Sequence, residues 1–260
     1  MDYKESLKTF SEACIEHGFK KSGKIFSRCI GDAIYQIICI NKYEFIRRDS
    51  PEFSPDNYKS PYISFNFWSM YSDLMEDYFD KRIVRYLGEF YPDNLDGKEF
   101  NYETFYGFNN HCEIMINKGL DFLDSITTQQ KLLEADYQLQ IAQDGREHPH
   151  KIVLSIPNYL FNRDCDKALK YLNSICARNY VNFTSSWPTP IPEEQYERYF
   201  EQEQELRDRM KDIPFLINAF TIRDDKAIRK YASECLEKNI LAAKKNKVPF
   251  MDSFNPIYTV

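Results

Sequence analysis

Two histidines separated by one proline, His148 and His150, form the sharpest chemical cluster in the sequence, with Asp144 and Glu147 close by in the chain. Imidazole nitrogens and carboxylate oxygens are common metal ligands, and an extended segment can direct two such histidines at one ion. A metal site also needs a third ligand from elsewhere in the fold, and no pattern supplies one. The sequence therefore favours a solvated loop here, retains His148 and His150 as metal candidates, and predicts no cofactor.

Nucleophilic catalysis would require a serine or cysteine beside an oriented base, and the chain contains only four histidines. His17 ends the first predicted helix, where an imidazolium complements the helix dipole. His111 and Cys112 are adjacent on a predicted helix, so their side chains do not face each other. The G-x-S-x-G pattern and the glycine-rich phosphate loops are absent. The sequence thus predicts no catalytic residues and favours a protein that is not an enzyme.

Two charged segments are candidates for binding a partner of opposite charge. A basic run interleaved with two phenylalanines could contact a nucleic-acid backbone, but the net charge of −6 argues against a broad phosphate-binding surface. Nucleic acid is therefore a disfavoured partner, and the run is interpreted as an exposed turn and strand. Six glutamates between positions 193 and 205 either dock a basic partner or, as favoured, form a solvated helix face. The basic run comprises Lys20, Lys21, Lys24 and Arg28.

Aromatic residues make up 16% of the chain, with 20 Phe and 19 Tyr, which predicts a core rich in rings. A sheet covered by helices on one face would leave rings on its open face, where exposed aromatics mark a binding patch. We therefore expect Tyr62, Trp68 and Tyr86 to be the binding residues for a protein partner.

The spacing of apolar residues predicts helices and strands in a definite order. A helix from Tyr3 to His17 ends at Gly18, and Gly31-Asp32 forms a tight turn between two strands. Successive strands without long intervening helices favour an antiparallel sheet. The predicted strands are 25–29, 33–41, 62–68, 81–87 and 100–106.

Beyond residue 110 the pattern becomes helical. Thr127 and Gln130 fit a capping box that starts a helix, and three prolines between 188 and 192 indicate a linker. The segment 151–161 fits either a strand or a helix, and helix is favoured. The other predicted helices are 112–123, 165–176, 193–211 and 224–245.

These elements predict an α+β fold, in which an N-terminal helix lies on a four- to five-stranded antiparallel sheet and an all-helical C-terminal half follows. The expected division is an α+β domain over residues 1–145 and a helical C-terminal region over residues 146–260. Whether the two parts pack as one body stays open.

The first half of the chain carries two matches to a known family. One is the string Gly18-Phe19-Lys20-Lys21-x-Gly23-x-x-Phe26-x-Arg28, and the other is the stretch G-L-D-F-L-D-S-I-T-T from Gly119 to Thr128. Residues 1–145 thereby resemble the bacterial DUF4304-like family, a domain of unknown function. The resemblance implies a bacterial origin and a compact α+β domain, and it brings no catalytic residues. Small domains of this kind sometimes neutralise toxins, which is an argument by analogy.

Seven cysteines at irregular spacings, without a C-x-x-C motif, indicate reduced core thiols rather than disulfides. The polar N-terminus and the lack of a long apolar run predict a cytoplasmic protein that neither enters nor spans a membrane. We therefore expect a non-enzymatic bacterial protein-interaction module with a toxin-neutralising, immunity-like role. The alternative is an uncharacterised metal-dependent or hydrolytic enzyme.

Overall fold

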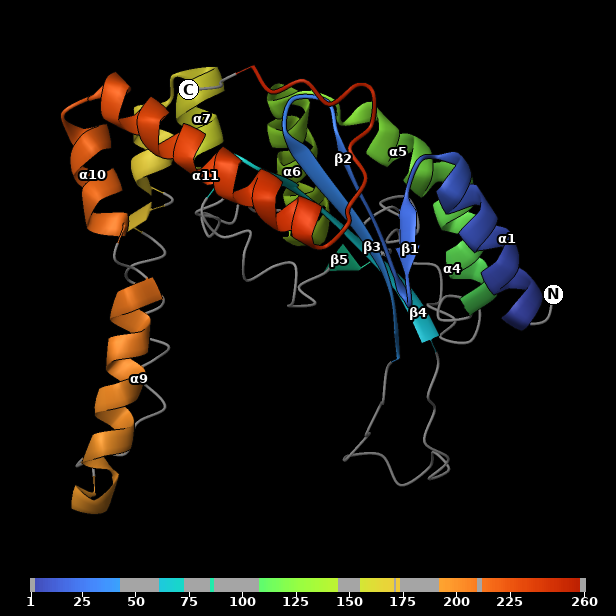
Figure 1. The fold of residues 1–260 in the computed structure, drawn as a ribbon, viewed down its shortest axis with the longest axis horizontal. Coiled ribbons are helices and arrows are strands. Elements are labelled where there is room, and N and C mark those ends of the chain that lie inside the picture. Colours follow the sequence, from blue (N-terminus) through green and yellow to red (C-terminus); the bar gives the residue numbers. More distant parts are fainter. Residues whose placement is uncertain are drawn as a thin grey trace.

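A five-stranded antiparallel sheet, with its strands in chain order, forms the centre of the fold (Figure 1). The computed structural model describes residues 3–42, 61–72, 85–86, 108–144, 155–170, 172–173, 192–209 and 212–257. The sheet and its flanking helices confirm the predicted α+β class. Its strands are β1 (Lys20–Ser22), β2 (Ile25–Ile30), β3 (Ile34–Lys42), β4 (Pro61–Ser69) and β5 (Arg85–Tyr86).

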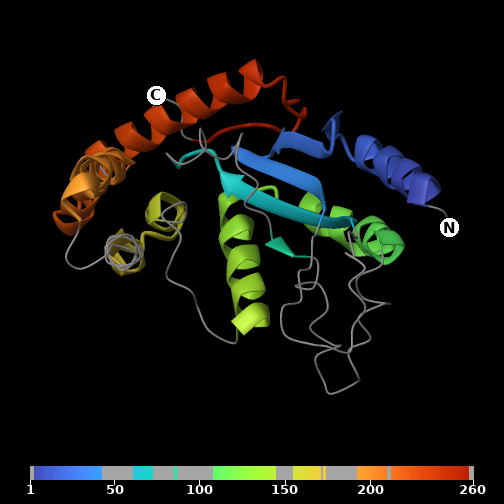
Figure 2. The ribbon, with the colours of Figure 1, turned by 90° about the horizontal axis from the view of Figure 1, so that it is seen from below.

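Helices cover both faces of this sheet (Figure 2). The helices α4, α5 and α6 lie on one side, whereas α11 lies across the other. The helix predicted from Asp224 is confirmed, since Asp224 caps α11 by accepting a hydrogen bond from the Ala227 amide. The helices are α1 (Tyr3–Glu16), α4 (Phe108–Ile114), the π-helix η3 (Met115–Gly119), α5 (Leu120–Ser125), α6 (Gln129–Asp144), α7 (Ser155–Asn162), the 3-10 helix η5 (Glu193–Gln195), α9 (Tyr196–Arg209), α10 (Ile213–Thr221) and α11 (Asp225–Lys245).

The coverage of both faces corrects the expectation of an exposed ring at Trp68. Trp68 is buried and stacks on Tyr35, with the ring centroids 5.7 Å apart and the ring planes at 13°. The period-two pattern of β4 could not show this, because it gives the face of a residue but not what covers that face. Tyr62 and Tyr86 lie on β4 and β5 as expected, and their side chains lie outside the described part of the chain.

The predicted turn between β2 and β3 is confirmed, and it also contacts the segment before α6. Gly31 has φ +55°, and a Cβ atom there would lie 2.0 Å from the Thr127 carbonyl oxygen. The Asp32 amide donates a hydrogen bond to this same oxygen over 2.9 Å. Only glycine combines this left-handed conformation with so close an approach, so the turn both reverses the chain and docks α6.

The segment after α11 completes one edge of the sheet. β1 pairs with residues 25–27 of β2, and the C-terminal segment continues along the other half of β2. The Cys29 amide donates to the Pro249 carbonyl, the Met251 amide to the Cys29 carbonyl, and the Asn255 amide to the Gly31 carbonyl, at 2.8–2.9 Å. These bonds satisfy backbone groups that an open edge would leave unpaired. Residues 249–255 therefore line the edge of β2 next to β1, without forming a further strand of the sheet among the described residues.

Several element boundaries differ from the sequence expectations. α6 is capped by Thr128, whose hydroxyl accepts a hydrogen bond from the Lys131 amide over 3.2 Å, so the prediction of Thr127 as the cap is wrong. The helical interpretation of 151–161 is confirmed for residues 155–161 by α7, whereas residues 151–154 lie outside the described part of the chain. The helix α10 was not predicted from the sequence. The predicted strand 100–106 and the proline-rich segment up to residue 191 lie outside the described residues.

Candidate functional sites

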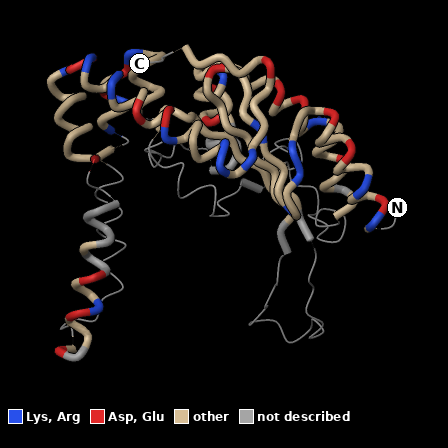
Figure 3. The backbone as a smooth tube through the Cα atoms, in the orientation of Figure 1, with Lys and Arg blue, Asp and Glu red and all other residues tan. Residues whose placement is uncertain are grey.

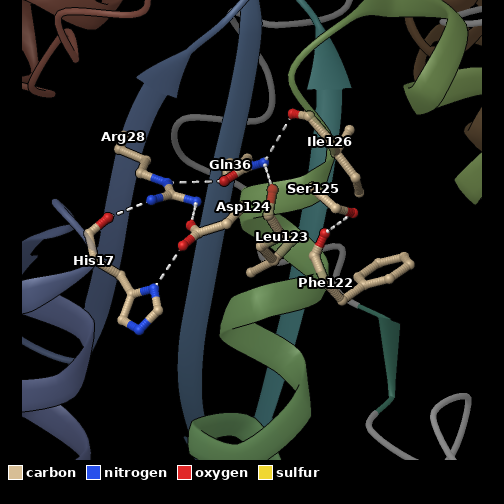
Figure 4. A network of polar contacts seen from close by, with 8 residues as sticks. All are labelled: His17, Arg28, Gln36, Phe122, Leu123, Asp124, Ser125 and Ile126. Atoms are coloured by element: carbon tan, nitrogen blue, oxygen red, sulfur yellow. Dashed lines mark hydrogen bonds and ion pairs between the residues drawn. The ribbon is translucent and has the colours of Figure 1, made fainter.

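A buried arginine on β2 is the centre of a polar cluster that joins four elements (Figure 4). Arg28 is 2% exposed, and each part of its guanidinium has an acceptor. Its Nε donates to Gln36 Oε1 over 2.9 Å, its Nη2 to Asp124 Oδ1 over 2.5 Å, and its Nη1 to the His17 carbonyl. The guanidinium also lies 4.1 Å from the centre of the Phe19 ring, a cation–π distance. These contacts compensate the buried charge.

The antiparallel register explains how this cluster is assembled. Arg28 pairs with Gln36 across β2 and β3, so their side chains share one face of the sheet. Gln36 in turn donates from Nε2 to the Leu123 carbonyl near the end of α5, over 2.7 Å. The expectation that Arg28 lies on an exposed strand is therefore wrong, whereas Lys20, Lys21 and Lys24 are exposed as expected.

Burial governs the electrostatics of this cluster. It lowers the pKa of the Arg28 guanidinium below its ordinary value, while the hydrogen bond and the charge of Asp124 act in the opposite direction. Asp124 itself is 40% exposed, so the pair joins a fully desolvated cation to a partly hydrated anion. The hydrogen bonds of the cluster hold Arg28, Gln36 and Asp124 in fixed positions.

His17 extends the cluster to the surface. Its Nδ1 lies 2.7 Å from Asp124 Oδ2, the carboxylate oxygen that Arg28 does not contact (Figure 4). Asp121, one helical turn earlier on α5, brings a third donor atom within 4.8 Å of the other two. His17 therefore has a carboxylate partner, which its position at the end of a predicted helix did not reveal.

Three buried cysteines, Cys14, Cys29 and Cys112, are poor nucleophiles. Cys14, on α1, is fully buried, and burial raises the pKa of its thiol far above the ordinary value. Burial likewise raises the pKa of Cys29 and of Cys112 to about 12. Since the thiolate is the reactive form, these thiols are inert at neutral pH, as the interpretation of reduced core thiols requires.

A second ion cluster joins α7 to the first turn of α11. Asp225 Oδ1 accepts hydrogen bonds from Arg163 Nη1 over 2.6 Å and from the Tyr159 hydroxyl over 3.0 Å, and Oδ2 accepts one from Arg229 Nε over 2.6 Å. The hydrogen bond from Arg229 is the largest cause that holds the pKa of Asp225 down to about 2, and Arg163 and Tyr159 act in the same direction. Asp225 and its two arginines reach water, whereas Tyr159 is buried, and the cluster links two helices.

An exposed aromatic pair on α9 is a third candidate site. Tyr196 is 55% exposed and Phe200 is 62% exposed, and a spacing of four residues places both on one side of the helix. The helix extends away from the sheet in Figure 1. Residues 193–209 carry seven acidic and three basic side chains, and Figure 3 shows acidic positions along the helix. Among the described side chains Glu193, Glu197 and Glu201 are exposed, as is Arg198, so this part of α9 and η5 combines apolar rings with negative charge.

Exposed aromatic residues were expected on the open face of the sheet, but those that the structure shows at this site lie on α9. The sequence signal for this surface was the helical spacing of Tyr196, Tyr199 and Phe200 among the glutamates. The same spacing is equally typical of a helix face that packs on a core.

His111, another candidate from the sequence, has a structural role in the fold. It is buried and its Nδ1 accepts a hydrogen bond from the Ile63 amide over 3.4 Å, so it holds β4 against α4. His148 and His150 lie outside the described residues.

No family model, curated protein or solved structure matches this chain. The resemblance of residues 1–145 to the DUF4304-like family therefore stays a prediction that depends on the quoted residues alone. Among the helices of the described ranges, none is both long and apolar enough to cross a lipid bilayer.

Proposed function

We propose that this protein is a bacterial, cytoplasmic, non-enzymatic interaction protein that binds a protein partner through α9. The observation that carries the proposal is the exposure of Tyr196 and Phe200 on a helix that extends away from the sheet. Large rings are costly to expose to water, and a pair of them one helical turn apart provides considerable apolar area for an interface.

The spacing of these rings fits a recurring binding mode. Partners that accept a helix in an apolar groove take up side chains at i and i+4 as anchors. Aromatic residues dominate the binding free energy of such interfaces when a pocket encloses them. Tyr196 and Phe200 supply these anchors, and the hydroxyl of Tyr196 can remain in water at the rim.

The charge of α9 indicates the chemistry of the partner. With seven acidic and three basic side chains in residues 193–209, the segment attracts a groove that is rimmed by lysine or arginine. Complementary charge steers association and selects among partners. A toxin that acts on nucleic acid needs a basic surface, so a toxin-neutralising, immunity-like role is the specific form of this proposal.

The polar clusters of the described residues support the same conclusion. Arg28 and Asp225 each hold several hydrogen bonds within the protein, and the contacts of both clusters join secondary-structure elements. Such arrangements stabilise the scaffold from which α9 extends.

The test measures complex formation by the full-length chain with each protein encoded beside its own gene. A double variant, Tyr196→Ser with Phe200→Ser, should weaken the binding of the true partner at least a hundredfold, which corresponds to about 3 kcal/mol for two anchors. Leu241→Ser is the matched control, because Leu241 is a comparably exposed apolar residue on α11. Equal affinity of the double variant and the wild type would refute the role of α9.

The alternative function, a metal-dependent or hydrolytic enzyme, is supported by one observation. Asp124 orients the imidazole of His17 over 2.7 Å at the surface, as a carboxylate orients a general base. This alternative predicts turnover on a panel of ester, phosphoester and peptide substrates that disappears in His17→Gln. Turnover of that kind, together with failure to bind any neighbour-encoded protein, would overturn the leading proposal.

A further inference from the structure

We propose that His17, Asp121 and Asp124 form a binding site for Zn²⁺ or a similar divalent transition metal. Each residue offers one donor atom, and the three atoms lie within 4.8 Å of one another. This set joins the end of α1 to α5 and does not involve α9, so it is independent of the proposed function.

The local structure brings the three side chains together for separate reasons. Asp121 and Asp124 are three residues apart on α5, so they occupy the same side of that helix. His17 follows directly after α1, and Gly18, with φ +80°, turns the chain away at this point. The imidazole is thereby held at the end of α1 next to the two carboxylates.

Arg28 prepares Asp124 for a metal without occupying the same oxygen. Its Nη2 binds Oδ1, whereas Oδ2 faces Nδ1 of His17 (Figure 4). Gln36 and the His17 carbonyl fix Arg28 in turn. Hydrogen bonds that orient metal ligands in this way commonly change metal affinity 10- to 100-fold.

The donor set selects the kind of metal. One imidazole nitrogen with two carboxylate oxygens suits Zn²⁺ and related ions, whereas Mg²⁺ and Ca²⁺ prefer oxygen ligands alone. Tetrahedral ligands at about 2.0–2.1 Å from zinc lie roughly 3.3 Å apart. The present separation of 2.7 Å between Nδ1 and Oδ2 would therefore open by about half an ångström, which a side-chain rotation provides. The fourth position is left to water.

Calorimetric titration of the metal-free full-length chain with ZnCl₂ in a non-chelating buffer tests this site. The expected result is one zinc bound per chain at micromolar concentrations, and no binding of millimolar Mg²⁺. His17→Gln and Asp121→Asn, which alter ligands on different elements, should each weaken zinc binding at least tenfold. Asp121 is exposed, so its variant retains the fold, and circular dichroism checks both proteins.

Two controls separate this site from other donors in the chain. Asp166→Asn alters an exposed carboxylate on the helical residues 165–170 and should leave zinc binding unchanged. A double variant, His148→Ala with His150→Ala, should also retain it. Three results would each overturn the proposal. The first is loss of zinc binding in that double variant, and the second is unchanged zinc affinity in both ligand variants. The third is a wild-type protein that binds no zinc below 100 μM, roughly the weakest affinity of interest for such a site.

Discussion

Asp124 and Asp225 are two carboxylates with similar partners in different surroundings. Each accepts short hydrogen bonds from an arginine, at 2.5 Å for Asp124 and 2.6 Å for Asp225. The arginine of Asp124 is Arg28, which is almost completely buried, whereas Arg163 and Arg229 at Asp225 are in contact with water. The comparison shows that the geometry of an ion pair says little about its contribution to stability until the burial of each partner is known.

The buried cluster is also asymmetric. Arg28 is desolvated, but Asp124 is 40% exposed and can be hydrated when its partner is absent. Removing the acid leaves a buried cation without its counter-charge, whereas removing the arginine leaves an anion that water can reach. The two halves of one pair should therefore differ in their effect on stability.

The largest effect is expected for Asp124→Ala. The substitution leaves the buried Arg28 guanidinium without its anion, which costs about 3–5 kcal/mol in the free energy of unfolding. Urea denaturation followed by circular dichroism measures the loss.

Arg28→Met is the matched comparison for this prediction, since methionine fills much of the volume and leaves no buried charge. It should cost about 2 kcal/mol, because Gln36 and the His17 carbonyl lose their donor. If Arg28→Met destabilises the protein more than Asp124→Ala, the expected asymmetry between the two halves of the ion pair is absent.

Asp32 extends the comparison to a buried carboxyl without an arginine partner. Its Oδ1 accepts hydrogen bonds from the Tyr71 hydroxyl over 2.8 Å and from the Ile257 amide over 2.9 Å, and Oδ2 has no partner among the described residues. Burial raises the pKa of Asp32 above its ordinary value, and these two hydrogen bonds oppose the shift only in part. The ionised form of Asp32 therefore destabilises the folded state at neutral pH.

Asp32→Asn should consequently raise the free energy of unfolding by about 1 kcal/mol at pH 7, since the amide oxygen keeps both hydrogen bonds without a charge. Because the folded pKa is raised, wild-type stability falls as pH rises from the unfolded value of about 4 through the folded pKa. The advantage of the variant should follow the same rise. A variant that is less stable than the wild type at pH 7 would show that the ionised carboxylate is needed.

The smallest effect is expected at the exposed cluster. Asp225→Asn should cost less than about 1 kcal/mol at pH 7 and low salt, and 0.5 M NaCl should reduce the difference further. Because the folded pKa of Asp225 is lowered to about 2, its contribution is present above the unfolded value of about 4 and is lost as pH falls through 2. Unfolding curves between pH 2 and pH 7 measure this difference, and a cost close to that of Asp124→Ala would contradict the comparison.

Much of the secondary structure follows from local pattern. The apolar spacing of Tyr3, Leu7 and Phe10 predicts α1, and the turn at Gly31 with its flanking strands predicts the β2–β3 hairpin. These elements depend on residues close in the chain, so the sequence contains what is needed to place them. The cap of α6 was misplaced by one residue, because Thr127 and Thr128 are adjacent and equally able to cap.

The candidate sites were harder to predict from the sequence than the secondary structure. The Arg28 cluster depends on Asp124, which lies 96 residues further along the chain. Nothing in the period of β2 indicates whether Arg28 faces a helix or water, since a strand pattern with a polar residue fits both. The opposite holds for the rings of α9, which are exposed although they are apolar. Apolar residues at helical spacing usually pack against a core, so the sequence did not indicate their exposure.

The sequence by itself determined the α+β class, the order of helix and strands, and the glycine turns, because helical and strand periods and the left-handed φ of glycine are local properties. Tertiary structure alone decided that Trp68 is buried, that Arg28 meets Asp124 and His17, and that residues 249–255 complete the edge of β2. Burial and contact depend on which distant segment covers a residue, and that depends on the packing of the whole chain.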